Sequence, residues 1–330
     1  MAILRAGLVG LGMMGRHHAR VLGSLEGVEL VAVADPGGDV HGAAGGREVL
    51  RTVEELVAKG VDYCVVAAPT GLHEEIGLVL AEAGVHTMLE KPLASDVAGA
   101  RRLAEAFGSR GLVGAVGHIE RYNPSLQRAR AMIADGHLGT ILQIVTRRQG
   151  PFPGRIADVG VVKDLATHDI DLTSWVAQRP FELVAAQAAY RSGRAHEDLI
   201  AITGRLEGGT VTSHLVNWLS PMKERVTVIT GEHGAFVCDT LTADLTYYAN
   251  GTTARAWDEV ANFRGVSEGD VVRYAIAKPE PLRTEHEAFR NAVQGKESDI
   301  VTLEQGVRIV EVAEAVLEAA ASGQVVRLSA

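Results

Sequence analysis

The hexapeptide Gly10-Leu-Gly-Met-Met-Gly15 identifies the first structural unit of this chain. It follows an apolar run over residues 3–9, which predicts a buried strand, and it precedes a helical pattern that begins at Arg16. In such a strand–turn–helix unit the first glycine makes the turn, the second lets the backbone approach a pyrophosphate, and the third lets the helix pack on the strand. The helix N-terminus then offers N–H groups to the phosphates. The sequence therefore predicts a dinucleotide site formed by Gly10, Gly12, Met13, Met14 and Gly15.

An acid follows at the position where a dinucleotide presents its adenosine ribose. Asp35 lies twenty positions after Gly15 and closes a second apolar run, over residues 28–34. A carboxylate there can accept hydrogen bonds from the ribose hydroxyls. Pro36-Gly-Gly38 comes next, and no basic residue occurs before Arg47, so a 2′-phosphate would meet a carboxylate and no arginine. The cofactor predicted from these residues is NAD rather than NADP.

Composition limits the class of protein. The chain has 330 residues, of which 47% are hydrophobic, enough for two domains with a core in each. Its net charge is −9 and neither half carries a basic stripe, which argues against nucleic acid and anionic membranes as partners. No leader and no membrane-spanning stretch is recognised, so we expect a cytoplasmic protein. Cys64 and Cys238 lie in separate apolar runs and predict buried thiols, not a disulfide or metal site.

Strand and helix patterns alternate through the first third of the chain. Near-continuous apolar strands that alternate with helices predict an α/β fold, a doubly wound parallel Rossmann sheet covered on both faces. Ligands of such sheets bind at the carboxyl ends of the strands. The predicted strands cover residues 3–9, 28–34, 61–68, 85–89 and 112–116. The residues expected near their carboxyl ends are Gly10, Asp35, Pro69, Lys91 and His118.

The pattern changes after His118. Helical patterns over residues 125–134 and 165–176 flank a run at 140–148, and short β-rich segments follow up to residue 249. Successive short strands separated by turns predict an open, mainly antiparallel sheet in an α+β domain. We expect an NAD-binding Rossmann domain over residues 1–120 and a substrate-binding and oligomerisation domain over residues 121–330. The last helical patterns, at residues 285–294 and 303–321, could pack back on the first domain.

Two groups of residues could carry chemistry. Lys91 follows the fourth predicted strand in Glu90-Lys-Pro92. Pro92 restricts the backbone of Lys91 and so fixes the direction of the lysine side chain. A cis peptide bond between Lys91 and Pro92 is a hypothesis. Asp164 and His168 are four residues apart and would share a helix face. An imidazole can take the proton of an alcohol as hydride leaves its carbon, while a lysine stabilises the developing alkoxide. A solvated lysine, a capping aspartate and a core histidine are the structural alternatives.

Other reactive groups are not indicated. His17, His18 and His73 are explained by packing or capping, and no histidine joins cysteines or carboxylates at the spacing of a zinc site. Neither a Gly-x-Ser-x-Gly elbow nor a phosphate-binding loop that ends in Lys and Ser or Thr occurs. We therefore predict no metal site, and hydride transfer is the natural chemistry for a dinucleotide and a general base.

These motifs, in this order and spacing, resemble the glucose-fructose oxidoreductase/inositol dehydrogenase/rhizopine-catabolism (Gfo/Idh/MocA) family. The resemblance covers essentially the whole chain, to Glu280-Pro-Leu282 and Val325-Val-Arg-Leu328. It implies that Lys91 contacts the reacting hydroxyl, that His168 is the acid or base, and that Asp164 supports it. It also implies that further residues bind NAD, namely Ala68, Pro69, Thr70, His73, Glu90 and Lys91.

A narrower resemblance concerns the branch that oxidises the 3-hydroxyl of UDP-N-acetylglucosamine with NAD. It rests on residues 117–124, 150–155 and 158–171. The chain differs from that branch in Tyr122, where Phe is expected, and in Lys163, where an aliphatic residue is usual, which could mean a different substrate. The substrate-binding residues that it implies are Lys91, Arg121, Tyr122, Asn123, Arg155, Lys163 and His168, with Arg147 and Arg148 as further candidates for a diphosphate.

The expected function is that of an NAD-dependent sugar dehydrogenase that acts on a secondary hydroxyl, the 3-hydroxyl of a UDP-N-acetylhexosamine. The alternatives are a dehydrogenase of a free monosaccharide or inositol and a non-catalytic NAD-binding regulatory protein. Lys91, Asp164 and His168 argue against the regulatory protein, because a protein that only binds NAD does not need residues arranged for acid–base catalysis. The helix-free face of the second sheet predicts a homodimer or homotetramer.

Overall fold

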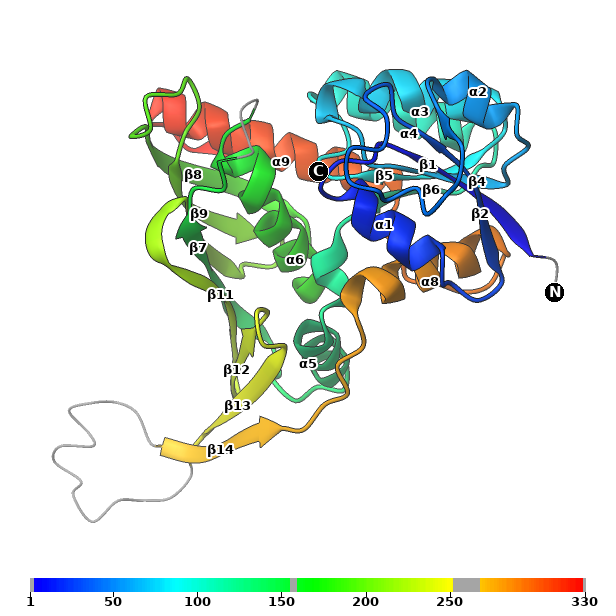
Figure 1. Ribbon diagram of the computed structural model, residues 1–330. Coiled ribbons are helices and arrows are strands. Elements are labelled where there is room, and N and C mark those ends of the chain that lie inside the picture. The colour runs from blue at the N-terminus through cyan, green and yellow to red at the C-terminus, as the bar shows by residue number, and fades with distance from the viewer. Residues whose placement is uncertain (1–2, 155–158, 252–267, 329–330) are drawn as a thin grey trace, which may run out of the picture. The chain divides into compact units, whose positions relative to one another are not determined.

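The computed structural model describes residues 3–154, 159–251 and 268–328 (Figure 1). The chain divides into two compact units. Residues 1–119 and 280–314 form the first unit, and residues 120–279 and 315–330 form the second. The division falls within one long helix, α9 (Leu303–Ser322), so each unit contains part of it.

The first unit contains a six-stranded parallel sheet in the order β3-β2-β1-β4-β5-β6. The predicted α/β fold with a doubly wound parallel sheet is confirmed, and the short edge strand β3 is an addition to it. The order reverses between β1 and β4, and ligands of open α/β sheets bind outside the carboxyl ends of the strands at such a point. The strands are β1 (Leu4–Val9), β2 (Val28–Ala34), β3 (Val49–Leu50), β4 (Tyr63–Val66), β5 (His86–Glu90) and β6 (Gly114–Gly117).

Local sequence explains where the helices of this unit begin. Thr52 accepts the backbone N–H of Glu55, and the Glu55 side chain accepts the N–H of Thr52, a capping box that starts α2 (Val53–Val57). Asp96 accepts the N–H of Gly99 and starts α4 (Val97–Gly108). These caps lie within two residues of the predicted helix starts.

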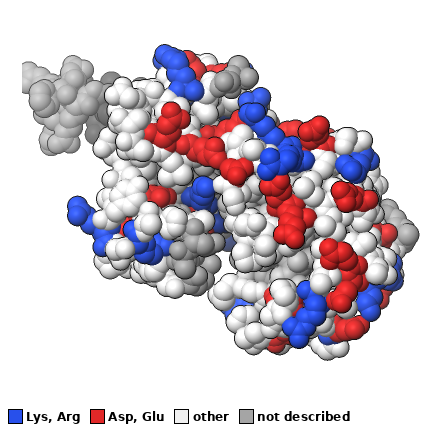
Figure 2. Space-filling view, turned by 90° about the horizontal axis from the view of Figure 1, so that it is seen from above, with Lys and Arg blue, Asp and Glu red and all other residues white. Residues whose placement is uncertain are grey.

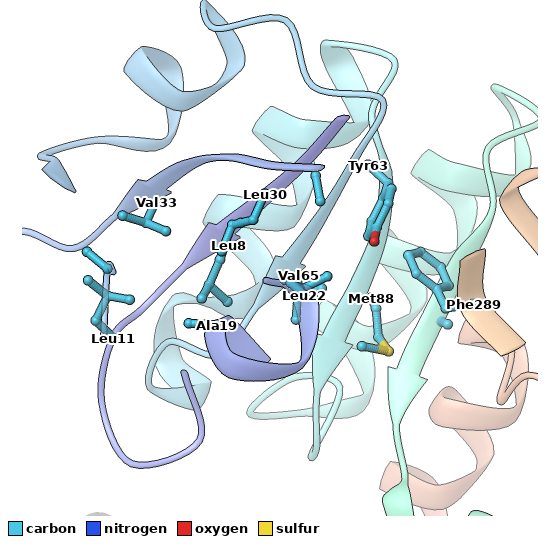
Figure 3. Close-up of a cluster of buried hydrophobic side chains, with 13 residues drawn as sticks. Leu8, Leu11, Ala19, Leu22, Leu30, Val33, Tyr63, Val65, Met88 and Phe289 are labelled. Carbon is cyan, nitrogen blue, oxygen red and sulfur yellow. The ribbon is translucent and has the colours of Figure 1, made fainter. Parts of the chain in front are cut away.

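Helices cover both faces of the sheet (Figure 1). Helices α2, α3 (His73–Glu82) and α4 lie on one face, and α1 (Gly15–Leu22) and α8 (Pro281–Val293) lie on the other. Figure 3 shows the core on the second face, where Leu22 of α1 and Phe289 of α8 meet side chains of the strands. The rings of Phe289 and Tyr63 pack edge to face with their centroids 5.5 Å apart. Helix α8 is thus part of this core although it lies far along the chain.

The second unit contains a nine-stranded sheet in the order β14-β13-β12-β11-β7-β10-β9-β8-β15. Only β7 and β10 pair in parallel among these described strands, so the predicted mainly antiparallel sheet is confirmed. The strands are β7 (Ile141–Pro151), β8 (Phe181–Ala189), β9 (Leu199–Leu206), β10 (Val211–Asn217), β11 (Leu219–Gly231), β12 (Gly234–Asp239), β13 (Asp244–Asn250), β14 (Glu268–Tyr274) and β15 (Val326–Arg327).

Helices α5 (Pro124–Ala134) and α6 (Thr167–Ala177) pack on one face of this sheet. Leu126 of α5 and Trp175 of α6 belong to the same buried cluster as Ile144 and Phe236 of the strands. On the opposite face, Val211 and Leu215 of β10 are 49% and 36% exposed. Successive side chains of a strand point to opposite faces of the sheet, so Val211 and Leu215 leave apolar surface on the open face.

Cys64 and Cys238 are buried free thiols, as predicted. In the part of the chain that the structure describes, the helices are all too short or too polar to cross a membrane. On the face seen in Figure 2, Lys and Arg side chains are interspersed with Asp and Glu side chains.

Candidate functional site

The three glycines of the turn after β1 have three different environments. Gly10 has a φ of 92°, and a Cβ there would lie 2.6 Å from the carbonyl oxygen of Ala67. A Cβ on Gly15 would lie 1.9 Å from the carbonyl oxygen of Gly10, so only glycine lets α1 begin here. A Cβ on Gly12, in contrast, would face open space. Gly10 and Gly15 are therefore required by the fold, whereas Gly12 keeps the surface of the turn free for a ligand.

Helix α1 begins without a side-chain cap among the described residues. Met14 stands at the N-cap position and makes no side-chain hydrogen bond, and no acidic residue lies in the first turn. Met13 is 42% exposed beside it. An uncapped helix N-terminus offers N–H groups and a positive dipole end to an anion. The turn thus fits the pyrophosphate of a dinucleotide.

Asp35 lies at the carboxyl end of β2, beside this turn. Its Oδ2 accepts the backbone N–H of Leu11 at 2.7 Å, and its Oδ1 accepts the N–H of Gly37 at 2.7 Å. The carboxylate therefore also joins the glycine turn to the loop after β2. This second role could not be read from the spacing of Asp35 in the sequence.

Arg51 is a basic residue near Asp35 that was not predicted. Its Nη1 donates to the carbonyl oxygen of Pro36 at 2.6 Å. The first basic residue after Asp35, Arg47, instead donates to the carbonyl oxygen of Leu30. Arg51 reaches this loop because it follows β3, which pairs with β2. Only the prediction of that two-residue strand could have revealed it.

Lys91 lies directly after β5, and its peptide bond to Pro92 is cis, which confirms that hypothesis. Glu90 is 7% exposed, and its Oε2 accepts the backbone N–H of Lys91 at 3.1 Å. Burial raises the pKa of Glu90, but the hydrogen bond from His18 and the charges of His18 and Lys91 outweigh it, so the pKa is lowered overall. Glu90 is thus an anion that holds the backbone of Lys91.

His73 connects the two segments that flank this strand end. Its Nδ1 lies 3.0 Å from the carbonyl oxygen of Pro92, and its Nε2 lies 2.9 Å from that of Ala68. Burial lowers the pKa of His73 although both carbonyls favour its protonated form, so the neutral ring donates to one carbonyl at a time. His73 therefore positions Ala68-Pro-Thr70 relative to Lys91-Pro92.

In the second unit, Asp164 and His168 lie on one continuous helical segment that begins with a π-helix, Val162–Ala166, and continues as α6. The helix predicted over residues 165–176 is present, and only its first two residues, 165 and 166, belong to the π-helix rather than to α6. His168 is 8% exposed, and Asp164 and Lys163 are half-buried. A π-turn inside a helix often occurs at a functional site.

Glu197 holds the start of this segment and was not predicted. Its Oε1 accepts the N–H of Val162 at 2.9 Å, and its backbone carbonyl accepts the N–H of Val161 at 3.0 Å. A Cβ on Gly160 would lie 2.1 Å from the same Oε1, so any other residue there would displace the Glu197 carboxylate. The acid is only 4% exposed and lies 37 positions after Gly160 in the sequence, where no local pattern connects the two.

The arginines proposed to bind phosphate differ in their environments. Arg121 is buried, and its Nε and Nη2 both donate to Asp171. Arg148 is also buried and donates to Glu120 at 2.8 Å and to Asp169 at 3.0 Å. A diphosphate would have to share these guanidinium groups with buried carboxylates.

Charge compensation explains this buried network. Burial raises the pKa of Asp169, whereas for Glu120 the charges of Arg148 and Arg225 outweigh burial and lower the pKa. Burial opposes the charge of Arg148, yet Asp169 and Glu120 raise its pKa overall. The network therefore favours the charged forms of Glu120 and Arg148, whereas burial opposes the charge of Asp169.

The remaining predicted substrate residues have separate locations. Arg147 is on the opposite face of β7 from Arg148 and pairs with Glu224 at 2.7 Å. Asn123 caps α5, and its Nδ2 donates to the carbonyl oxygen of Thr240. Tyr122 is 5% exposed. Arg155 lies outside the described residues.

Comparisons with known proteins match two consecutive parts of the chain. The NAD-binding Rossmann fold of the Gfo/Idh/MocA oxidoreductase family matches residues 4–118. The C-terminal alpha/beta domain of that family matches residues 130–328.

Two curated relatives differ in how much of the chain they match. UDP-N-acetylglucosamine 3-dehydrogenase of Acidithiobacillus ferrooxidans is 29% identical over 89% of this chain and 90% of its own length. Inositol 2-dehydrogenase 2 of Saccharopolyspora erythraea is 31% identical, over 59% of this chain and 60% of its own length.

Solved structures agree in fold. The structure of the Acidithiobacillus ferrooxidans enzyme, GnnA, has a TM-score of 0.84 at 26% identity and covers 98% of this chain and 99% of its own. GenD2 from gentamicin A biosynthesis, solved in complex with NAD, has a TM-score of 0.82 at 26% identity and covers 100% of this chain and 97% of its own.

Proposed function

The chain belongs to the Gfo/Idh/MocA family of NAD-binding oxidoreductases, and we propose that it oxidises a secondary hydroxyl of a sugar, the 3-hydroxyl of a UDP-N-acetylhexosamine. The position of Lys91 carries this proposal. It lies at the carboxyl end of β5, in the sheet whose β1 leads into the glycine turn, and Glu90 holds its backbone. A relative that matches nine-tenths of the chain is named for the 3-hydroxyl of UDP-N-acetylglucosamine, which supports this substrate.

The residues of the first unit fit the NAD that the family binds. Gly12 leaves the turn open, the N-terminus of α1 lacks a side-chain cap in the described chain, and Asp35 lies beside both. We assign the pyrophosphate to the turn and the adenosine ribose to Asp35. Ala68, Pro69, Thr70, His73 and Glu90 complete the proposed NAD-binding set. When bound, NAD accepts the hydride that leaves the sugar carbon.

The proposed chemical roles fall on three side chains. The ammonium group of Lys91 binds the reacting hydroxyl and stabilises negative charge on its oxygen as the proton leaves. The imidazole of His168 takes that proton as general base. Asp164, on the same helical segment, supports the charged imidazole. Arg121, Tyr122, Asn123, Arg155 and Lys163 are proposed to contact the remainder of the substrate.

A second candidate substrate is inositol or a free monosaccharide. The observation that favours it is the match to inositol 2-dehydrogenases, which are 31% or more identical in several cases but over less than two thirds of the chain. Lys163 and Tyr122, the two departures from the nucleotide-sugar branch, are also consistent with a different substrate.

The substrate is tested by incubating the protein with NAD and a panel of nucleotide sugars, free sugars and inositols while reduced nicotinamide is followed. We expect strong turnover of a UDP-N-acetylhexosamine. Turnover of inositol alone would establish the second candidate. Binding of NAD without turnover of any compound would contradict both and favour a regulatory role.

We also propose that the protein forms a homodimer or homotetramer through the open face of the nine-stranded sheet and works in the cytoplasm. The exposed Val211 and Leu215 on that face support the assembly, and the free thiols of Cys64 and Cys238 suit a reducing compartment. Light scattering should show two or four chains, and a charged residue in place of Leu215 should reduce the mass. A monomer in the unmodified protein would refute the assembly.

A further inference from the structure

Three buried side chains form a hydrogen-bonded chain behind Lys91. His18 of α1 is fully buried, and its Nε2 lies 2.9 Å from Oε1 of Glu90. On its other side, Nδ1 of His18 lies 2.9 Å from Nε2 of His286, which belongs to α8 and is 1% exposed. The two rings meet edge to face, with centroids 5.1 Å apart. The chain therefore runs from α8 through α1 to the strand end that precedes Lys91.

The direction of the hydrogen bond between His18 and Glu90 follows from the charge of Glu90. Glu90 is an anion and can only accept, so the proton of this contact lies on Nε2 of His18. Burial and the charges of His18 and Arg283 hold the pKa of His286 well below its usual value, so this ring is neutral. Nδ1 of His18 and Nε2 of His286 share one proton in their hydrogen bond, so each ring nitrogen depends on the other for its partner.

The contact between the two histidines leaves one buried polar atom without a hydrogen bond. Nδ1 of His286 is buried and has no hydrogen-bond partner among the described residues. A buried polar atom without a partner costs about 1–3 kcal/mol. An apolar side chain of similar size at position 286 would avoid that cost but would leave Nδ1 of His18 without its hydrogen-bond partner.

We propose that His286 and His18 are positioning residues that hold the carboxylate of Glu90 against the backbone N–H of Lys91. Glu90 uses one oxygen for His18 and the other for Lys91, so the histidines act on Lys91 through this carboxylate. The inference rests on the proposed role of Lys91 at the reacting hydroxyl. It adds two residues, one of them 195 positions after Lys91, to the set that orients this lysine.

The test compares His286→Leu with His286→Gln in the full-length protein with NAD bound. Leu keeps the volume but removes the hydrogen-bond partner of Nδ1 of His18, whereas the amide of Gln, which can donate or accept, retains it. Hydrogen exchange at the amide of Lys91 reports directly on its hydrogen bond to Glu90. Because Pro92 has no N–H, the residue that follows Lys91 contributes no exchanging amide, and exchange at Lys91 can be assigned separately.

We expect exchange at Lys91 to become about tenfold faster in His286→Leu, the effect of losing roughly one hydrogen bond, and to return to the wild-type rate in His286→Gln. With UDP-N-acetylglucosamine as the probe, kcat should fall by about the same factor while KM stays nearly unchanged. Removing a buried histidine elsewhere, by His214→Leu, should leave exchange at Lys91 unaffected.

A purely structural role predicts a different pattern. Exchange would then rise throughout α1 and α8 in both variants, and Gln would not restore it. Unchanged exchange at Lys91 in His286→Leu would overturn the proposal. If the wild-type protein oxidises none of the tested compounds, the proposed function fails, and the exchange measurement still determines whether the histidines hold Lys91.

Discussion

The carboxylate of Asp35 accepts the backbone N–H of Leu11 at 2.7 Å, so the acid assigned to the adenosine ribose also holds the glycine turn. Asp35→Ser should weaken NAD binding about tenfold through loss of this charge-assisted bond, and it should raise affinity for NADP. Calorimetry with each dinucleotide checks both effects. An unchanged preference for NAD would remove Asp35 from the ribose site.

Arg51 should then become the anchor of a 2′-phosphate, because its Nη1 already contacts the carbonyl oxygen of Pro36. In the Asp35→Ser background, Arg51→Gln should abolish the gain in NADP affinity, a loss of about tenfold for one ion pair with a phosphate. Arg47→Gln is the matched control and should have no such effect. Equal losses in the two double variants would argue against a specific contact.

Substitution of Gly12 should affect ligand binding, whereas substitution of Gly15 should affect folding. Gly12→Ala places a methyl group in open space, so the melting temperature should stay near that of the wild type. The methyl group should still obstruct the pyrophosphate and weaken NAD binding about tenfold or more. Gly15→Ala collides with the carbonyl oxygen of Gly10 and should cost about 3 kcal/mol of stability. The reverse pattern would contradict the assignment of the turn.

Gly160 and Glu197 should act on catalysis through the π-helix that carries Asp164. Gly160→Ala would displace the Glu197 carboxylate, and Glu197→Ala would remove the acceptor of the Val162 N–H. Each should reduce kcat about tenfold or more through misplacement of the segment, with NAD affinity unchanged. Steady-state kinetics and calorimetry distinguish the two quantities. Full activity of both variants would show that this contact serves only the fold.

Substitution of Lys91 or His168 should reduce turnover without weakening cofactor binding. His168→Ala should lower kcat about 10²- to 10⁴-fold through loss of the general base. Lys91→Ala should lower it about 10²- to 10³-fold through loss of charge stabilisation. The affinity for NAD, measured by calorimetry, should change little in either. Near-normal turnover in one variant would refute the role assigned to that residue.

The free energy of unfolding should depend on pH through the buried His214. Burial lowers its pKa to about 4, whereas the unfolded chain has the ordinary value of 6.5. The unfolded state therefore binds one more proton between these values, and stability falls by about 3 kcal/mol as the pH drops from 6.5 to 4. In His214→Leu the decline should be smaller by that amount in denaturant titrations at several pH values. The same decline in the variant would exclude His214 as its source.

The local order of residues was enough to predict the parallel sheet, the glycine turn, Asp35 and the position of Lys91. Each depends on neighbours within a few residues or on a repeating apolar pattern, because a strand, a turn and a helix start are local conformations. The short edge strands β3 and β15 escaped prediction. Each spans only two residues, too few to show a period.

Only the tertiary structure could bring Arg51 to Pro36, Glu197 to Gly160 and His286 to His18. These pairs are separated by 15, 37 and 268 positions, and their contacts result from strand pairing and helix packing rather than from local pattern. Tertiary structure also paired Arg121 with Asp171 and Arg148 with Glu120, because a buried guanidinium needs a carboxylate beside it. The sequence alone thus determined the fold class and the glycine turn. The tertiary structure determined which side chains hold the proposed catalytic residues in place, since those contacts exist only once distant elements have packed together.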